Sequence, residues 1–179
     1  MKLKLILPIL IIGLIFVSGC IQTESGTGTL VMQITDKPAD FEIEKAIVTI
    51  SNIKVHKADY NEGDNESNES EAGWYTVVEE SQTFDLIEIK DVKEFLGSTE
   101  LESGKYTQIR LDVESALATI NGTDHDLTIP SRTIKLTKSF TINTNETTTL
   151  TIDFDANESI HATGNGKYIM KPTIKVIQE

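Results

Sequence analysis

The sequence predicts an all-β protein that folds as an antiparallel, Greek-key-like β-sandwich with one short connecting helix. Short segments rich in Val, Ile, Thr and Tyr follow one another, separated by Gly, Asn and Asp. Several of them alternate apolar and polar residues, as at Leu150, Ile152 and Phe154. Such alternation is typical of strands with one buried face. We find one convincing helix signal, so helices are not expected to build the core.

The expected strands fill most of the chain after residue 29. We expect them at residues 30–35, 46–55, 74–78, 83–89, 106–113, 116–120, 127–129, 132–136, 140–142, 150–154 and 168–177. In the segment 46–55, the apolar residues Val48 and Ile50 are at even positions, whereas Ile53 and Val55 are at odd positions. A regular strand would place these two pairs on opposite faces, so the change predicts a bulge near residues 51–52. Asn121-Gly122 is the pair that a type I′ hairpin turn prefers.

The helix is predicted over residues 91–97. Asp91 is a suitable N-cap and Glu94 completes a box-like arrangement. Val92, Phe95 and Leu96 form the apolar face, and Gly97 ends the helix.

A tyrosine corner is predicted beside the strand that starts near Tyr106. In some sandwiches a tyrosine at a strand entry donates its hydroxyl to nearby backbone. Leu101, Gly104 and Tyr106 fit that arrangement.

The N-terminus has the pattern of a lipoprotein signal. Lys2 and Lys4 precede an apolar run of 13 residues, 5–17, and Ser18-Gly19 supplies the small residues before Cys20. This run is shorter than the roughly 20 residues of a membrane-spanning helix. We therefore expect cleavage before Cys20 and lipidation of its thiol. The alternative is an uncleaved signal anchor, and both place the remainder outside the membrane.

The expected organisation is a signal peptide at residues 1–19, a lipidated Cys20 with a short tether to residue 29, and one domain at 30–179. Because Cys20 is the single cysteine, internal disulfides are excluded. Loss of the leader changes the formal charge from -12 to -14. Such an acidic surface makes nucleic-acid binding improbable.

An acidic insertion at residues 59–73 holds six acids and no Lys or Arg. It superficially resembles a calcium loop, but glycine stands at the fifth position, where an EF-hand needs it at the sixth. We favour a solvated loop, and weak calcium binding stays open.

Asp36, Asp153 and Asp155 form the other candidate site. Paired carboxylates could hold calcium or act as the acid and base of a glycosidase. The alternative, which we favour, is that these acids bond turn backbone or pair with Arg110. His56, His125 and His161 show no metal-ligand spacing, and no nucleophile or phosphate motif occurs.

Five Asn-x-Ser/Thr sequons are candidate glycosylation sites. They lie in predicted turns or loops, at Asn65, Asn68, Asn121, Asn145 and Asn157.

Several short sequence segments, taken together, resemble those of a known family. They are TDKPAD (35–40), LESGKYTQIRL (101–111), IPS (129–131), IDFDA (152–156) and KPTI (171–174). In this order they resemble the prokaryotic lipoproteins known as domain of unknown function 4382, over about residues 28–177. The resemblance implies a prealbumin-like or immunoglobulin-like sandwich on the outside of a bacterial or archaeal cell. It implies no activity and no catalytic residue. The insertion between Lys57 and Trp74 departs from the family, whose members commonly have a shorter turn there.

These features predict a non-catalytic interaction or binding module, anchored through Cys20 to the outer face of the cell membrane and without a resident cofactor. Its expected partners are an envelope protein, a glycan or a solute. One alternative is a carboxylate-based hydrolase of extracellular polysaccharide, and another is a calcium-dependent carbohydrate-binding module. A transporter recognition subunit ranks last, because such subunits generally need two α/β lobes.

Overall fold

The computed structural model describes residues 26–37, 43–58 and 73–179. Three parts of the sequence hypothesis lie outside these residues. They are the leader with Cys20, the sequons at Asn65 and Asn68, and the acidic insertion up to residue 72. Within the described residues, no helix has the length and apolar character needed to span a membrane.

The first of two sheets has four strands in the order β12-β9-β1-β5. Their bounds are Thr27–Asp36 for β1, Glu94–Glu102 for β5, Thr147–Phe154 for β9 and Ile174–Gln178 for β12. β5 and β12 run antiparallel to their neighbours, whereas β1 and β9 are parallel. The sandwich is therefore not wholly antiparallel, which corrects the prediction at its central pair.

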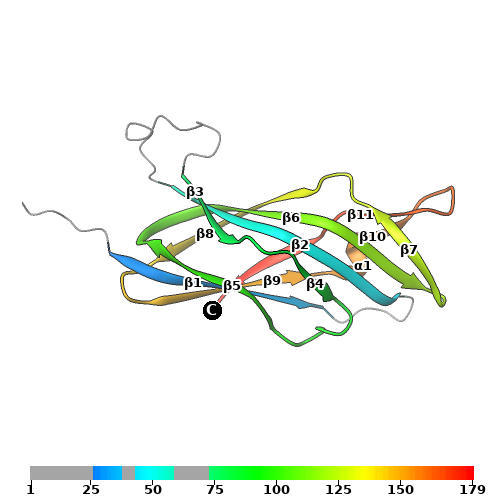
Figure 1. Cartoon of the computed structure of the whole chain (residues 1–179), viewed down its shortest axis with the longest axis horizontal. Helices are drawn as coiled ribbons and strands as arrows, with labels where there is room; N and C mark the ends of the chain where they lie inside the picture. Colours follow the sequence, from blue (N-terminus) through cyan, green and yellow to red (C-terminus); the bar gives the residue numbers. More distant parts are fainter. Residues whose placement is uncertain (1–25, 38–42, 59–72) are drawn as a thin grey trace, which may run out of the picture.

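The second sheet has eight strands and is built on two long neighbours, β2 (Ile43–Lys57) and β6 (Gly104–Ile120). β2 also pairs with β3 (Trp74–Val78) and β4 (Gln82–Asp85). β6 also pairs with β8 (Thr133–Ile142) and β7 (Thr123–Thr128). β11 (Tyr168–Met170) joins β7 in parallel, and β10 (Ile160–Ala162) completes this edge. Figure 1 shows the two sheets as stacked layers.

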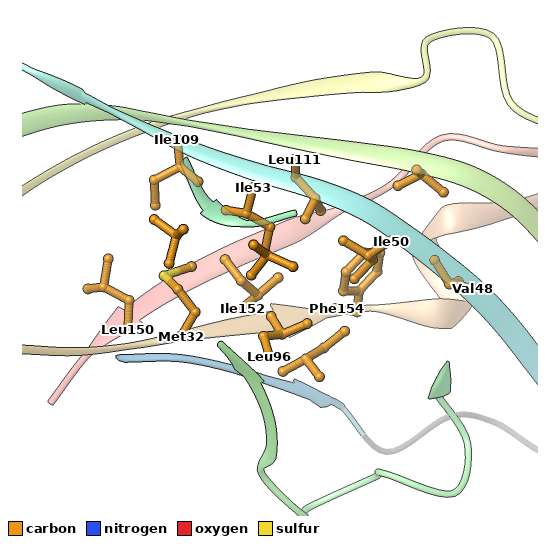
Figure 2. Close-up of a cluster of buried hydrophobic side chains, with 14 of the residues drawn as sticks. Met32, Val48, Ile50, Ile53, Leu96, Ile109, Leu111, Leu150, Ile152 and Phe154 are labelled. Atoms are coloured by element: carbon orange, nitrogen blue, oxygen red, sulfur yellow. The ribbon is translucent and has the colours of Figure 1, made fainter. Parts of the chain in front are cut away.

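The hydrophobic core fills the space between the sheets. Figure 2 shows Ile50, Ile53 and Leu111 of the larger sheet facing Ile152 and Phe154 of the smaller one. All five side chains are fully buried. Each strand contributes alternate residues because successive side chains point to opposite faces. This core confirms the two-sheet, all-β prediction.

The predicted bulge and hairpin turn are both present. The pairing of β2 with β6 shifts register between Ile50 and Asn52, so that Ile50 and Ile53 both face the core. Asn121 and Gly122 have φ angles of 51° and 69°, as a type I′ turn requires, and Ile120 pairs with Thr123 across it.

The predicted helix at residues 91–97 is wrong. Asp91 has a φ of 61°, and residues from Glu94 onward form β5 against β1. Val92 and Phe95, expected on a buried helical face, are 49% and 58% exposed. Leu96 is buried because a register shift opposite Met32 and Gln33 turns it inward. The connecting helix is instead α1 (Ala156–Ser159), with Asp155 as its N-cap.

Other boundaries differ for local reasons. β4 ends at Asp85, because the Asp85 carboxylate accepts from the backbone N–H groups of Ala46 and Ile87 and so fixes a turn. The segments 106–113 and 116–120 form one strand, as do 132–136 and 140–142. The segment 168–177 is split between β11 and β12, which lie in different sheets with Pro172 between them. The expected tether is shorter, because β1 starts at Thr27.

The predicted tyrosine corner is confirmed. Tyr106 is fully buried, and its hydroxyl donates to the backbone carbonyl oxygen of Glu102 at 3.0 Å. Gly104, between them, has a φ of 146°, a conformation that side-chain-bearing residues rarely adopt. The Tyr106 ring stacks on Phe140 with centroids 5.3 Å apart. The corner therefore ties the turn before β6 to the core.

Candidate functional site

A hollow of about 590 Å³ lies at one end of the sandwich, beside the β6–β7 turn. It is lined from four directions: the start of β2, the β6–β7 turn, the α1–β10 segment and β11. The lining residues are Ile43, Ile120, Asn121, Asn157, Ile160, Ala162 and Tyr168. Because these residues come from distant parts of the sequence, the fold is needed to assemble the hollow.

Local bonds fix the walls of this hollow. The turn is held by Glu44, whose carboxylate accepts from the Gly122 backbone N–H at 2.9 Å. α1 is held by Asp155, which accepts from the backbone N–H of Glu158 at 3.1 Å. Tyr168 packs against His125 with ring centroids 4.7 Å apart, across the parallel β11–β7 pair. These contacts hold the walls in place before any ligand binds.

The hollow has the chemistry of a binding site for an uncharged ligand. Ile43, Ile120 and Ile160 offer apolar surface, and Tyr168 adds an aromatic ring. Asn121 and Asn157 supply amide groups that can both donate and accept hydrogen bonds. The lining therefore combines apolar side chains with polar groups that can fix the orientation of a ligand.

The three predicted carboxylates lie near one another but have separate structural tasks. Asp36 ends β1, and its Oδ1 accepts from the Ala156 backbone N–H at 3.0 Å. Asp155 caps α1 and pairs with the Lys37 ammonium at 3.1 Å. Asp153 lies at the end of β9, opposite Thr35 on β1 and Lys175 on β12.

The geometry thus favours the backbone-bonding role for Asp36 and Asp155 over a metal or acid–base role. None of these carboxylates lines the hollow. Among the described residues, no group of three or more His, Cys, Asp or Glu side chains is placed to hold a metal ion. Arg110 does not pair with them. Its guanidinium carbon lies 3.9 Å from the ring centroid of Trp74, and both residues belong to the larger sheet, whereas Asp36 and Asp153 belong to the smaller one.

Asp36 is electrostatically unusual. The residue is 2% exposed, and burial raises the pKa of its carboxyl to about 7. Hydrogen bonds from the Ala156 and Lys37 backbones oppose this rise, whereas the negative charges of Asp155 and Asp153 add to it. Its Oδ2 is buried and has no hydrogen-bond partner within the described part of the chain. Such a carboxyl is a stability element that responds to pH.

Three of the predicted sequons lie in described residues. Asn121 and Asn145 are exposed in tight turns with positive φ, and Asn157 is half-buried in α1. Asn121 and Asn157 line the hollow, which their sequon pattern did not predict. Sequence reasoning also missed Tyr168 and Ile160. No local pattern in the sequence shows that β7 and β11 become neighbours, so nothing near Asn121-Gly122 signalled the hollow.

A comparison with family models matches residues 27–172 to the family described as domain of unknown function (DUF4382). The chain belongs to the DUF4382 family. The match covers β1 through β11 and so includes the hollow and every strand of the two sheets except β12. A search of curated proteins and a search of solved structures found no match.

Proposed function

We propose that this DUF4382 protein is a lipid-anchored, extracytoplasmic and non-catalytic binding module. The observation that carries the proposal is the position of the hollow relative to the point where the chain enters the sandwich. The Ser103 backbone N–H donates to the Gly26 carbonyl at 2.7 Å, so the chain enters beside the start of β6. Ile120, in the wall of the hollow, is the last residue of β6.

β6 sets the distance between these two ends. It has 17 residues, and a strand rises about 3.3 Å per residue, so it spans roughly 50 Å. Figure 1 shows β1 starting at one end of the long axis and the β6–β7 turn at the other. In the sequence, five residues separate Cys20 from Gly26. A lipid on Cys20 would hold the entry end near the bilayer and present the hollow to the surroundings.

The hollow best suits a sugar residue of an envelope glycan. Sugar rings have an apolar face that packs on aromatic rings and hydroxyls that bond to amides, and Tyr168, Asn121 and Asn157 provide both kinds of group. The carboxylate hydrolase is the weaker proposal, because Asp36, Asp153 and Asp155 do not line this hollow.

Two measurements test the proposal. Fractionation of cells that make the parent or the Cys20→Ser variant should place the parent in the membrane pellet and the variant in the soluble fraction. Titration with neutral envelope glycans should show binding that Tyr168→Ala weakens at least about tenfold, with the Tyr168→Phe variant close to the parent. Recovery of the parent in the soluble fraction would contradict membrane attachment through Cys20. Equal affinity of the parent and Tyr168→Ala would contradict ligand binding in the hollow.

A further inference from the structure

The outer face of the larger sheet carries a row of three basic side chains on adjacent strands. Lys54 of β2 is the direct partner of Arg110 of β6, and Arg110 is the direct partner of Lys135 of β8. Their sequence neighbours Ile53 and Ile109 are fully buried, so the three basic residues have the opposite, outward parity. Neighbouring strands are about 4.8 Å apart, which sets the step between these charges. We call this row the basic face.

The basic face is unusual for this chain. The protein has a formal charge of -12, yet three like charges occupy directly opposed positions, an arrangement that destabilises a sheet. Lys54 is itself engaged in an interaction, so the inference rests on Arg110 and Lys135. Within the described residues, the ion pairs involve Lys37, Lys57 and Lys93 instead.

Trp74 holds the Arg110 guanidinium in a fixed position. The guanidinium carbon lies 3.9 Å from the Trp74 ring centroid, and His56 packs against the same ring at 4.9 Å. Arg110 Nε and His56 Nδ1 are buried and have no hydrogen-bond partner in the described part of the chain. Because the guanidinium is planar and already positioned, it can bind a carboxylate with little further loss of conformational freedom.

Polar side chains, including the carboxylate of Asp112, flank the basic face along the strands. Gln108 and Thr137 are direct partners on one side, and Asp112 and Thr133 are partners on the other. The Thr133 hydroxyl donates to Asp112 Oδ1 at 2.6 Å, so one oxygen of this carboxylate already has a hydrogen-bond partner. The face therefore offers positive charge in a line across the strands, bordered by groups that hydrogen-bond to hydroxyls.

We propose that the basic face binds an acidic polysaccharide, with uronate carboxylates on Arg110 and Lys135. A uronic acid polymer carries one negative charge per sugar and brings hydroxyls for Gln108 and Thr137. An anionic bilayer fits less well, because it would also meet the acidic remainder of the surface. This inference depends neither on lipidation of Cys20 nor on the hollow.

Calorimetric titration of the purified full chain with polygalacturonate at low salt tests the proposal. The parent should bind, and Lys135→Gln and Arg110→Gln should each weaken binding at least about tenfold, since a charge-assisted hydrogen bond is lost. Arg110→Lys keeps the charge but loses the bidentate geometry, so it should fall between parent and Arg110→Gln. Lys167→Gln is the matched control, because Lys167 is also exposed and lies in the β10–β11 turn, away from the basic face. This variant should leave the affinity unchanged.

Three results would overturn the proposal. One is the absence of polygalacturonate binding by the parent. Another is equal weakening by Lys167→Gln and Lys135→Gln, which would indicate non-specific attraction. The third is binding of polyglutamate of matched length as tightly as polygalacturonate, which would assign the face to acidic peptides. Because Lys135 is exposed, its variant stays informative even where Arg110→Gln perturbs folding.

Discussion

Single side chains at the ends of strands stabilise this sandwich by hydrogen-bonding to the backbone of its turns. Tyr106 fixes the turn before β6, Asp85 fixes the turn after β4, and Asp155 starts α1. Asp36 belongs to the same group, because it binds the Ala156 backbone and thereby ties the end of β1 to α1. Two of the acids that the sequence offers as catalytic candidates, Asp36 and Asp155, therefore bond to backbone groups.

Removing the Tyr106 hydroxyl should cost stability. Tyr106→Phe keeps the ring stacked on Phe140 but loses the bond to the Glu102 carbonyl. We expect the free energy of unfolding to fall by about 1–3 kcal/mol in urea titrations. Tyr168→Phe, at a half-buried tyrosine that packs against the edge of the core, should change it by less than about 0.5 kcal/mol. Identical midpoints for parent and Tyr106→Phe would show that the corner contributes nothing.

Asp36 should make stability fall as pH rises. Its folded pKa of about 7 exceeds the ordinary value of 3.8, so the folded state holds a proton that the unfolded state releases. The stabilisation is complete below about pH 4 and is lost by about pH 7, at up to roughly 1.4 kcal/mol per pH unit between them. Asp36→Asn keeps an acceptor for Ala156 and removes the titration.

Urea unfolding at pH 5, 6, 7 and 8 checks this expectation. His56 acts in the opposite direction, because burial and then Arg110 lower its pKa, so its contribution is lost as pH falls. The decisive quantity is therefore the difference between parent and Asp36→Asn. The free energy of unfolding of Asp36→Asn should increase relative to that of the parent as the pH rises to 7. A difference that does not vary with pH would contradict the assignment.

The elements themselves depend on turns of defined backbone conformation. Gly122 has a φ of 69° in the β6–β7 turn, whereas Gly164, in the β10–β11 turn, does not have a left-handed φ. A Cβ atom at either position would meet no heavy atom within 4 Å. The two glycines therefore differ in backbone conformation and not in crowding.

Gly122→Ala should destabilise the protein by about 1–2 kcal/mol, because an L-residue pays that cost in the left-handed region. Gly164→Ala should be neutral or slightly stabilising, since it restricts the unfolded chain. Thermal unfolding of both variants measures the contrast. Equal melting temperatures would mean that the β6–β7 turn does not need its positive φ.

Local sequence patterns predicted those elements whose backbone conformation is determined by their own residues. The parity change in β2 and the Asn121-Gly122 turn are of this kind, because bulges and type I′ turns have strong local signatures. The helix at residues 91–97 failed because Leu96 finds its buried position through pairing with β1, some sixty residues away in the sequence. The split of β11 from β12 and the parallel β1–β9 pair also depend on distant partners. The hollow shares that dependence, since four separate segments line it.

At the scale of the whole molecule, the long β2 and β6 strands run between the two ends of the sandwich. The chain enters at one end, beside the start of β6, and the hollow opens at the other. The basic face lies between these ends, on the outside of the larger sheet. This arrangement suits a protein that is held at one end and binds at its far end and along its flank.

The attachment of the entry end to a membrane is the central claim, and intact mass spectrometry of the chain purified from its own cells tests it most directly. We predict the mass of residues 20–179 plus that of the acyl groups on Cys20, recovered from the membrane fraction. Sugar on the sequons would add to this mass in hexose-sized steps, which enzymatic or chemical deglycosylation removes. A chain that begins at Met1, carries no acyl mass and is recovered in the soluble fraction would contradict the account.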